Sequence, residues 1–100
     1  MKPLGTVIEN ILRRHNLWYA YQQHLIIDSW VTIVGSELSE VTRAEKISKG
    51  VLLVFVKDSV WAYHLSMLKP QLIKKLNNYA GNKIVKDIIF QIGELEKKEK

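Results

Sequence analysis

The sequence predicts an α+β domain in which helices cover one face of a three-stranded sheet. Apolar residues recur at helical spacing from Leu4 to about Asn16 and from Trp18 to about Val34. Over residues 41–56 the pattern changes to that of strands, and over residues 59–77 it returns to helical spacing. A last alternating segment, residues 84–92, completes the sheet.

The first helix is predicted from one apolar face, and it should end near residues 14–16. That face consists of Leu4, Val7, Ile8, Ile11 and Leu12. The second helix carries one apolar stripe in its first half and another in its second half, which ends at Val34. Gly35 either caps this helix or lies inside it as a close-packing point, because Leu38 continues the repeat.

The segment 41–47 is a plausible amphipathic strand, and a short turn through Gly50 follows it. Residues 51–56, VLLVFV, are apolar on both faces and rich in β-branched residues. They predict a central strand that is buried on both sides. In the last strand, alternation places Ile88, Phe90 and Ile92 inward.

The helix over residues 59–77 contains a proline in its interior. Its stripe consists of Trp61, Leu65, Leu68, Leu72 and Leu76. Asp58 and Ser59 offer an N-cap, and Gly81 lies where the helix should end. Because Pro70 lacks an amide hydrogen and clashes with the preceding turn, we expect a kink or break at Lys69–Pro70.

From the second helix onward, the predicted order is helix, strand, strand, helix, helix, strand. This is the element order of type II KH domains, and Pro70 lies where such a domain turns between its two core helices. KH domains hold nucleotides with a GxxG loop. The corresponding residues here, 68–71, read LKPQ and contain no glycine. The sequence therefore predicts a KH-like fold without the usual RNA-binding loop.

One hundred residues, 47% hydrophobic and 25% charged, are typical of one globular domain. We expect residues 1–93 to form that domain and residues 94–100 a charged, solvated tail. The chain has no cysteine, which excludes disulfides and thiolate metal sites. Glu9 and Asn10 interrupt the N-terminal apolar stretch, so we expect no signal peptide and a cytoplasmic location without a membrane partner.

The net charge of +5 is distributed unevenly. Residues 1–40 carry a net charge of −1, residues 41–86 a charge of +7, and residues 87–100 a charge of −1. This asymmetry favours a surface that faces a polyanion, although lysines that only maintain solubility are the alternative. The candidate nucleic-acid-binding residues are Arg43, Lys46, Lys49, Lys57, Lys69, Lys74 and Lys75. A bend at Pro70 would let the last three share one surface with lysines of the strands.

The sequence contains no pattern that indicates an enzyme or a cofactor site. His15, His24 and His64 are widely separated, and none has a second ligand at helical spacing. Asp58 and Ser59 are better explained as a helix cap than as parts of a catalytic triad. There is no glycine-rich phosphate-binding loop. We therefore expect neither catalytic turnover nor a structural metal.

The aromatic residues divide by context. Trp30 and Trp61 lie on apolar stripes, which favours burial in the core over stacking on bases. The stripe of Trp18 and Tyr19 runs into polar positions instead. These two residues either pack against the first helix or form a partner-binding patch.

Several short motifs, taken in order, resemble the DciA-type domain of bacteria. They are W-x3-V-G at residues 30–35, K-G-V-L-L-V at 49–54, S-x-W-x3-L at 59–65, L-N at 76–77, and Gly81 before V-x-D-I-x-F at 85–90. The resemblance covers about residues 4–93. Members often continue into a long flexible extension, whereas this chain ends seven residues after Gly93.

The resemblance implies a KH-like domain that helps the ring-shaped replicative helicase engage DNA without itself hydrolysing ATP. Lysines of residues 43–86 would hold phosphates, and such contacts do not depend on base sequence. The matched residues Trp30, Gly35, Trp61, Leu65 and Asn77 are interpreted as structural. Two alternatives stay open: an RNA-binding module, for example one associated with the ribosome, and a protein adaptor whose lysines bind no nucleic acid.

Overall fold

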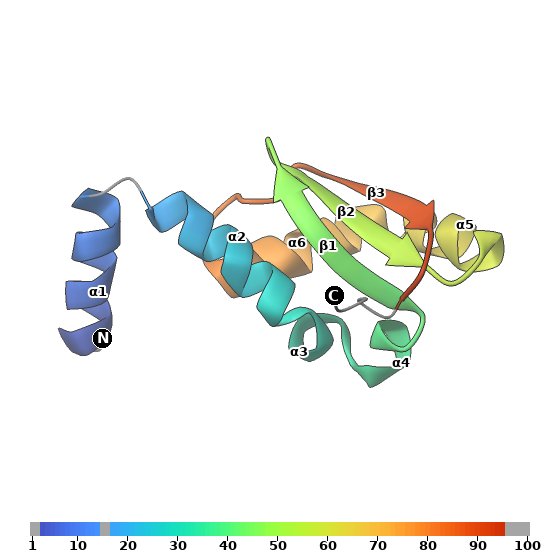
Figure 1. The fold of residues 1–100 in the computed structure, drawn as a ribbon, viewed down its shortest axis with the longest axis horizontal. Helices are drawn as coiled ribbons and strands as arrows, with labels where there is room; N and C mark the ends of the chain where they lie inside the picture. The colour runs from blue at the N-terminus through green and yellow to red at the C-terminus, as the bar shows by residue number, and fades with distance from the viewer. Residues whose placement is uncertain (1–2, 15–16, 96–100) are drawn as a thin grey trace.

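The chain folds into six helices and a three-stranded sheet within residues 3–14 and 17–95, which the computed structural model describes (Figure 1). The elements are α1 (Pro3–Arg14), α2 (Trp18–Asp28), α3 (Trp30–Val34), α4 (Ser36–Ser39), β1 (Thr42–Ser48), β2 (Val51–Val56), α5 (Ser59–Met67), α6 (Lys69–Ala80) and β3 (Asp87–Ile92). The predicted α+β class is confirmed. The end expected for the first helix at His15 and Asn16 lies outside the described residues. No described helix is both long and apolar enough to cross a membrane.

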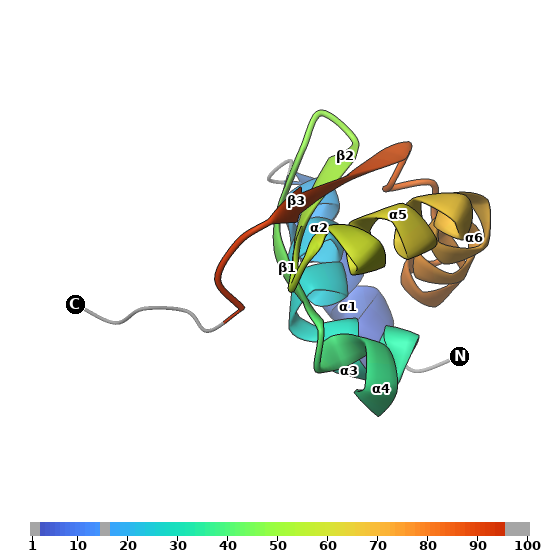
Figure 2. The same ribbon diagram turned by 90° about the vertical axis from the view of Figure 1, so that its right-hand side faces the viewer.

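The sheet has the order β1-β2-β3, with β1 and β2 antiparallel and β2 and β3 parallel. Seen close to edge-on, it has α5 and α6 on one side (Figure 2). The central position of β2 is therefore confirmed, but its predicted burial on both faces is wrong. Leu52, Val54 and Val56 are fully buried, whereas the residues between them are only partly buried.

The other face of β2 is covered by side chains and the chain end rather than by a helical layer. The Arg43 guanidinium lies 4.9 Å from the centre of the Phe55 ring. A β-carbon on Gly93 would come within 2.5 Å of that ring, so the backbone at Gly93 packs directly against it. Apolar residues on both faces of a strand thus indicate contact on both sides, not two helical layers.

The predicted second helix is two helices, separated at Ser29. Hydrogen bonds still cross the break, since the Ser29 amide donates to the Leu25 carbonyl at 3.0 Å and the Ile33 amide to the Ser29 carbonyl at 2.9 Å. Gly35 has φ 94°, a conformation that favours glycine, and it ends α3 immediately before α4 begins. Of the two roles considered for Gly35, the structure shows the helix end.

The break predicted near Pro70 is confirmed. Leu68 separates α5 from α6, and Pro70 lies in the first turn of α6. Amides in the first turn have no acceptor within the helix, so the missing amide hydrogen of Pro70 costs α6 no hydrogen bond. The Asp58 carboxylate caps α5 by accepting from the Trp61 amide at 3.0 Å. Gly81 ends α6 in the left-handed conformation, as expected.

The last strand begins at Asp87, three residues later than predicted. The reason lies in α6, where the Asn77 side-chain oxygen accepts from the amides of Ile84 and Val85 at 3.0 and 2.8 Å. Those amides cannot then join the sheet, although both side chains are buried. Ile88 is buried as expected. Ile92 pairs with the buried Val56 and so lies on the predicted face, but at the end of the strand it is 56% exposed.

Two tryptophans were expected in the core, and they differ. Trp30 is 6% exposed and belongs to the buried cluster, which confirms the prediction. Trp61 is only partly buried and packs against the edge of that cluster, with the His64 ring 5.8 Å from its own. Trp61 is therefore less buried than predicted, and it lies at the edge of the core and not inside it.

Candidate nucleic-acid interface

The turn between β1 and β2 presents a lysine at its tip. Lys49 and Gly50 form a two-residue turn with φ values of 54° and 83°. Such a hairpin turn needs positive φ at both positions, and Asn-Gly is its preferred sequence. Lys49 is the one described residue other than glycine with positive φ. A lysine therefore occupies a position where asparagine would fit the backbone better.

Lys86 is placed beside this turn by backbone contacts. Its amide donates to the Gly50 carbonyl at 2.7 Å. Its aliphatic stem lies over Gly50, where an added β-carbon would meet the Lys86 Cδ at 2.9 Å. The backbone bond and the stem contact at Gly50 therefore place Lys86 beside the turn that carries Lys49.

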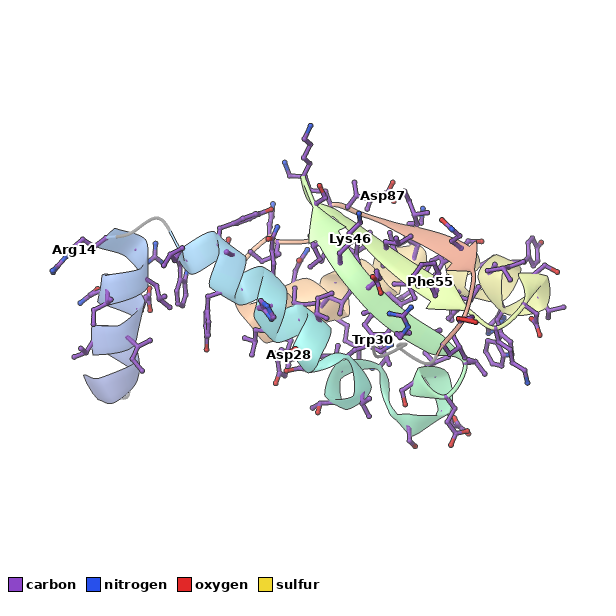
Figure 3. All side chains as sticks on the ribbon, viewed as in Figure 1. Arg14, Asp28, Trp30, Lys46, Phe55 and Asp87 are labelled. Carbon is purple, nitrogen blue, oxygen red and sulfur yellow. The ribbon has the colours of Figure 1, made fainter. Side chains whose placement is uncertain are left out.

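A β-bulge directs Lys46 to the exposed face of the sheet. Ala44 pairs with Val54 and Lys46 with Leu53, so Glu45 is an extra residue in β1. Without the bulge, strict alternation would turn Lys46 toward the core. The extra residue instead points Ile47 inward and Lys46 outward. Figure 3 shows Lys46 and Phe55 on the sheet and Asp87 at β3.

Lys46, Lys49 and Lys86 are all exposed, and we call them the hairpin lysines. Within the described part of the chain, none of them forms an ion pair. Three cations without a carboxylate partner at one end of a sheet form an electropositive surface that phosphate groups could occupy.

Lys69 reaches the same end of the sheet, but a carboxylate neutralises it. Its Nζ lies 3.0 Å from Asp87 Oδ1. The hydrogen bond from Lys69, followed by that from the Ile88 amide, holds the pKa of Asp87 below its ordinary value. The pair therefore persists at neutral pH and is lost only in acid, as pH falls through that lowered pKa.

Arg43 and Lys57 lie toward the opposite end of the strands. The Arg43 guanidinium bonds to the Glu45 carboxylate and to the Glu94 carbonyl, and it stacks on Phe55. Its donors are thus engaged within the protein. Lys57 is exposed, and its backbone amide donates to the Val41 carbonyl at 3.0 Å.

Lys74 and Lys75 occupy a third place, on the outer side of α6. This helix buries Leu72 and Leu76 toward the sheet. At about 100° per residue, Lys74 points away from that buried side and Lys75 to its flank. The break at Leu68 does not bring them to the exposed sheet face, where Lys46 lies. The seven candidate residues therefore form three separate groups instead of one surface.

The loop that carries Lys83 and Lys86 is fixed by polar side chains that sequence reasoning left without a functional role. Asn77 donates to the Val85 carbonyl at 2.9 Å in addition to accepting from two amides. Gln22, almost fully buried on α2, donates to the Ala80 carbonyl at 3.1 Å and accepts from Asn82. Lys83 and Lys86 belonged to the basic segment of the sequence, yet only their place in this loop shows which one lies beside the hairpin.

The structure favours packing for Trp18. Its ring lies 5.5 Å from that of Tyr21, and the Arg13 guanidinium of α1 lies 5.1 Å above it. Tyr19 is partly exposed, and its hydroxyl approaches the Ile84 carbonyl at 3.5 Å. Trp18 therefore packs on its neighbours, and a partner-binding role for the exposed Tyr19 stays a prediction.

Comparison with known proteins identifies the family. The family model described as "Dna[CI] antecedent, DciA" matches residues 3–90. Among curated relatives, UPF0232 proteins of Mycobacterium bovis and Mycobacterium tuberculosis are 24% identical over 87% of this chain and 46% of their own length. One from Mycolicibacterium paratuberculosis is 25% identical over 84% of the chain and 46% of its length. The chain thus spans less than half of these relatives, and over nearly all of its own length it belongs to the DciA family.

Proposed function

We propose that this protein binds DNA through phosphate contacts, without catalysing a reaction, and assists a replicative helicase. Family membership supports the helicase role. The observation that carries the DNA-binding role is the group of hairpin lysines, which form no ion pair with any residue that the structure describes. Lysine ammonium groups act on phosphates as point charges, so binding should be nearly independent of base sequence.

The distribution of charged side chains over the sheet supports contact with DNA at the hairpin end. Lys46, Lys49 and Lys86 lie at the hairpin end. At the opposite end, Arg43 bonds to the Glu45 carboxylate and to the Glu94 carbonyl, and Lys57 is exposed. Within the described residues, a polyanion such as the DNA backbone would meet three exposed lysines at the hairpin end, two along α6 and Lys57 at the opposite end. We propose the hairpin as the primary contact, because the turn and the hydrogen bond from the Lys86 amide to the Gly50 carbonyl bring Lys49 and Lys86 together.

The test is one titration series with labelled single-stranded DNA, duplex DNA and structured RNA over a range of salt concentrations. We expect DNA binding that weakens with salt, with a slope of about −0.9 per duplex phosphate contacted. Tighter binding to the RNA than to either DNA would favour the RNA-binding alternative. No binding to any of them at moderate salt would favour the adaptor.

The helicase role requires a separate experiment. Purified replicative helicase should be retained by the immobilised protein after nuclease treatment of both. Retention that disappears with nuclease would mean that nucleic acid bridges the two proteins, and it would remove the support for direct contact.

Lys49→Asn should stabilise the fold and weaken DNA binding at the same time. A residue other than glycine in the left-handed conformation costs about 1 kcal/mol, and asparagine tolerates it better than lysine. We expect the free energy of unfolding in urea to rise by up to about 1 kcal/mol while DNA affinity falls. A variant that binds DNA as tightly as the parent would remove Lys49 from the interface.

Asp87→Asn should strengthen DNA binding. Asparagine can still accept from the Ile88 amide, but it no longer neutralises Lys69. We expect higher affinity, and a salt slope steeper by about 0.9 if Lys69 then reaches a phosphate. Unchanged affinity and slope would show that Lys69 lies outside the contact.

A further inference from the structure

The face of the sheet that lies opposite α5 and α6 carries apolar side chains, although no described helix covers it (Figure 2). Alternation along the strands turns the neighbours of the buried residues toward this face. Leu53 of β2 pairs with Lys46 of β1 and with Ile89 of β3, so these three residues form one row across the sheet. Leu53 is partly buried, and Ile89 is 51% exposed. Open sheet faces usually carry polar side chains, so these apolar residues indicate a surface that a partner covers.

The chain itself covers one end of this face, the end at Phe55. The Arg43 guanidinium lies 4.9 Å from the centre of the Phe55 ring, and the backbone at Gly93 packs against the same ring. The row of Leu53 and Ile89 lies nearer the hairpin, beyond this cover. The half of the face next to the hairpin is therefore the part that a partner can reach.

Three cations border that row. Lys46 ends the row on β1, and Lys49 and Lys86 lie at the adjoining turn. All three are exposed, and none forms an ion pair with a residue that the structure describes. The nearby carboxylate of Asp87 is neutralised by Lys69, whose Nζ lies 3.0 Å away. A partner that matches this surface therefore has apolar side chains at its centre and carboxylates where it meets the lysines.

We propose that this half of the sheet binds an amphipathic helix of another protein. The apolar stripe of that helix lies on Leu53 and Ile89, and its aspartates or glutamates meet the hairpin lysines. Neighbouring strands are about 4.8 Å apart, so a row across three strands is about 10 Å wide, which is close to the diameter of a helix. The contact removes apolar area from water and gives the lysines carboxylate partners.

A single-stranded nucleic acid matches this surface less closely than an acidic helix does. Unpaired bases bind by stacking on aromatic rings. Phe55 is the aromatic residue that the described strands present on this face, and its ring is already in contact with Arg43 and Gly93. Phosphates could meet the lysines, but they would leave Leu53 and Ile89 exposed to water.

A second copy of this chain lacks the required acidic helix. Helices α1 and α5 both expose apolar side chains. However, α5 contains no aspartate or glutamate, and the one acidic residue of α1, Glu9, is paired with Arg13. Each copy also carries a net charge of +5, so two copies repel each other. Charge therefore favours a different, acidic protein as the partner.

The inference does not rest on the proposed DNA binding, although both involve the hairpin lysines. DNA and the acidic helix should compete for these lysines. Leu53 and Ile89, in contrast, should contribute to binding of the helix alone. Substitutions at these two positions therefore separate the two kinds of binding.

The experiment titrates the full chain into three labelled synthetic peptides of roughly 16 residues, long enough to form a helix. The first has leucines on one helix face and glutamates beside them. The second has the same composition with the leucines spread around the helix, and the third has lysines in place of the glutamates. We expect the first peptide to bind on the order of tenfold or more tightly than either of the others. In amide NMR spectra it should shift signals of β2 and β3 around Leu53 and Ile89.

Leu53→Thr with Ile89→Thr should weaken binding of the first peptide on the order of tenfold, with affinity for duplex DNA unchanged. Threonine keeps the preference for a strand and removes most of the apolar surface. The matched control is Tyr63→Gln with Met67→Gln, which removes exposed apolar side chains from α5 instead and should bind the peptide like the parent. Circular dichroism checks each fold, and if the Leu53 substitution disturbs it, Ile89→Thr alone makes the same comparison.

Three results would overturn the proposal. The first is equal affinity for the amphipathic acidic peptide and its rearranged form, which would mean that charge alone attracts them. The second is full peptide affinity in the threonine variant. The third is a shift of the Leu53 and Ile89 signals by oligothymidine DNA and not by the acidic peptide, which would make this face a nucleic-acid surface. Binding of duplex DNA without binding of the peptide refutes this inference alone, and the reverse result refutes only the proposed DNA-binding function.

Discussion

Replacing Lys49 and Lys86 together by glutamate should remove most of the protein's affinity for DNA. The Lys86 side chain contacts Gly50 of the turn that carries Lys49, and neither lysine forms an ion pair within the described residues. Reversal replaces two attractions with two repulsions. We expect affinity for duplex DNA to fall on the order of tenfold or more at moderate salt, and the salt slope to flatten by about 0.9 for each phosphate that the variant no longer binds.

The matched control is Lys74→Glu with Lys75→Glu, which changes the net charge equally on the outer side of α6. If total charge decided binding, both double variants would lose the same affinity. If the hairpin end is the contact, the α6 variant should keep most of it. The reverse result, with the hairpin variant unaffected and the fold intact by circular dichroism, would move the DNA site to α6.

Much of the fold could be predicted because its signals are local. The apolar spacing of residues 59–77 and the proline within them fix two helices and a break, since both depend on backbone chemistry within a few residues. The late start of β3 could not be predicted in this way. It depends on Asn77, whose side-chain oxygen accepts hydrogen bonds from the amides seven and eight residues further along the chain. No periodic pattern indicates such a bond.

The candidate site was predicted only as a segment. Charge counting identifies residues 41–86 as basic, but it cannot tell which lysines come together. The bulge at Glu45 decides where Lys46 points, and the hydrogen bond from the Lys86 amide to the Gly50 carbonyl places Lys86 beside the turn. Asp87 neutralises Lys69 across 18 positions of sequence, a pairing that only the fold creates. Formal charge therefore overstates the free charge of the surface.

Trp30→Ala should be among the most destabilising single substitutions in this domain. The side chain is 6% exposed within the main buried cluster. Its indole N–H donates to the Thr42 hydroxyl oxygen at 2.9 Å, and the Thr42 hydroxyl donates to the Leu38 carbonyl at 2.6 Å. One side chain thus ties α3 to β1 and, through Thr42, to α4. We expect the free energy of unfolding to fall by about 3–5 kcal/mol.

Two further variants separate burial from hydrogen bonding. Trp30→Phe keeps an aromatic ring in the core but removes the donor to Thr42, so it should cost about 1 kcal/mol for the hydrogen bond in addition to the smaller ring. Trp61→Ala should cost clearly less than Trp30→Ala, because Trp61 is only partly buried. Urea denaturation of the three variants measures these differences. Equal losses for Trp30→Ala and Trp61→Ala would mean that Trp61 supports the core as fully as its place on the apolar stripe first predicts.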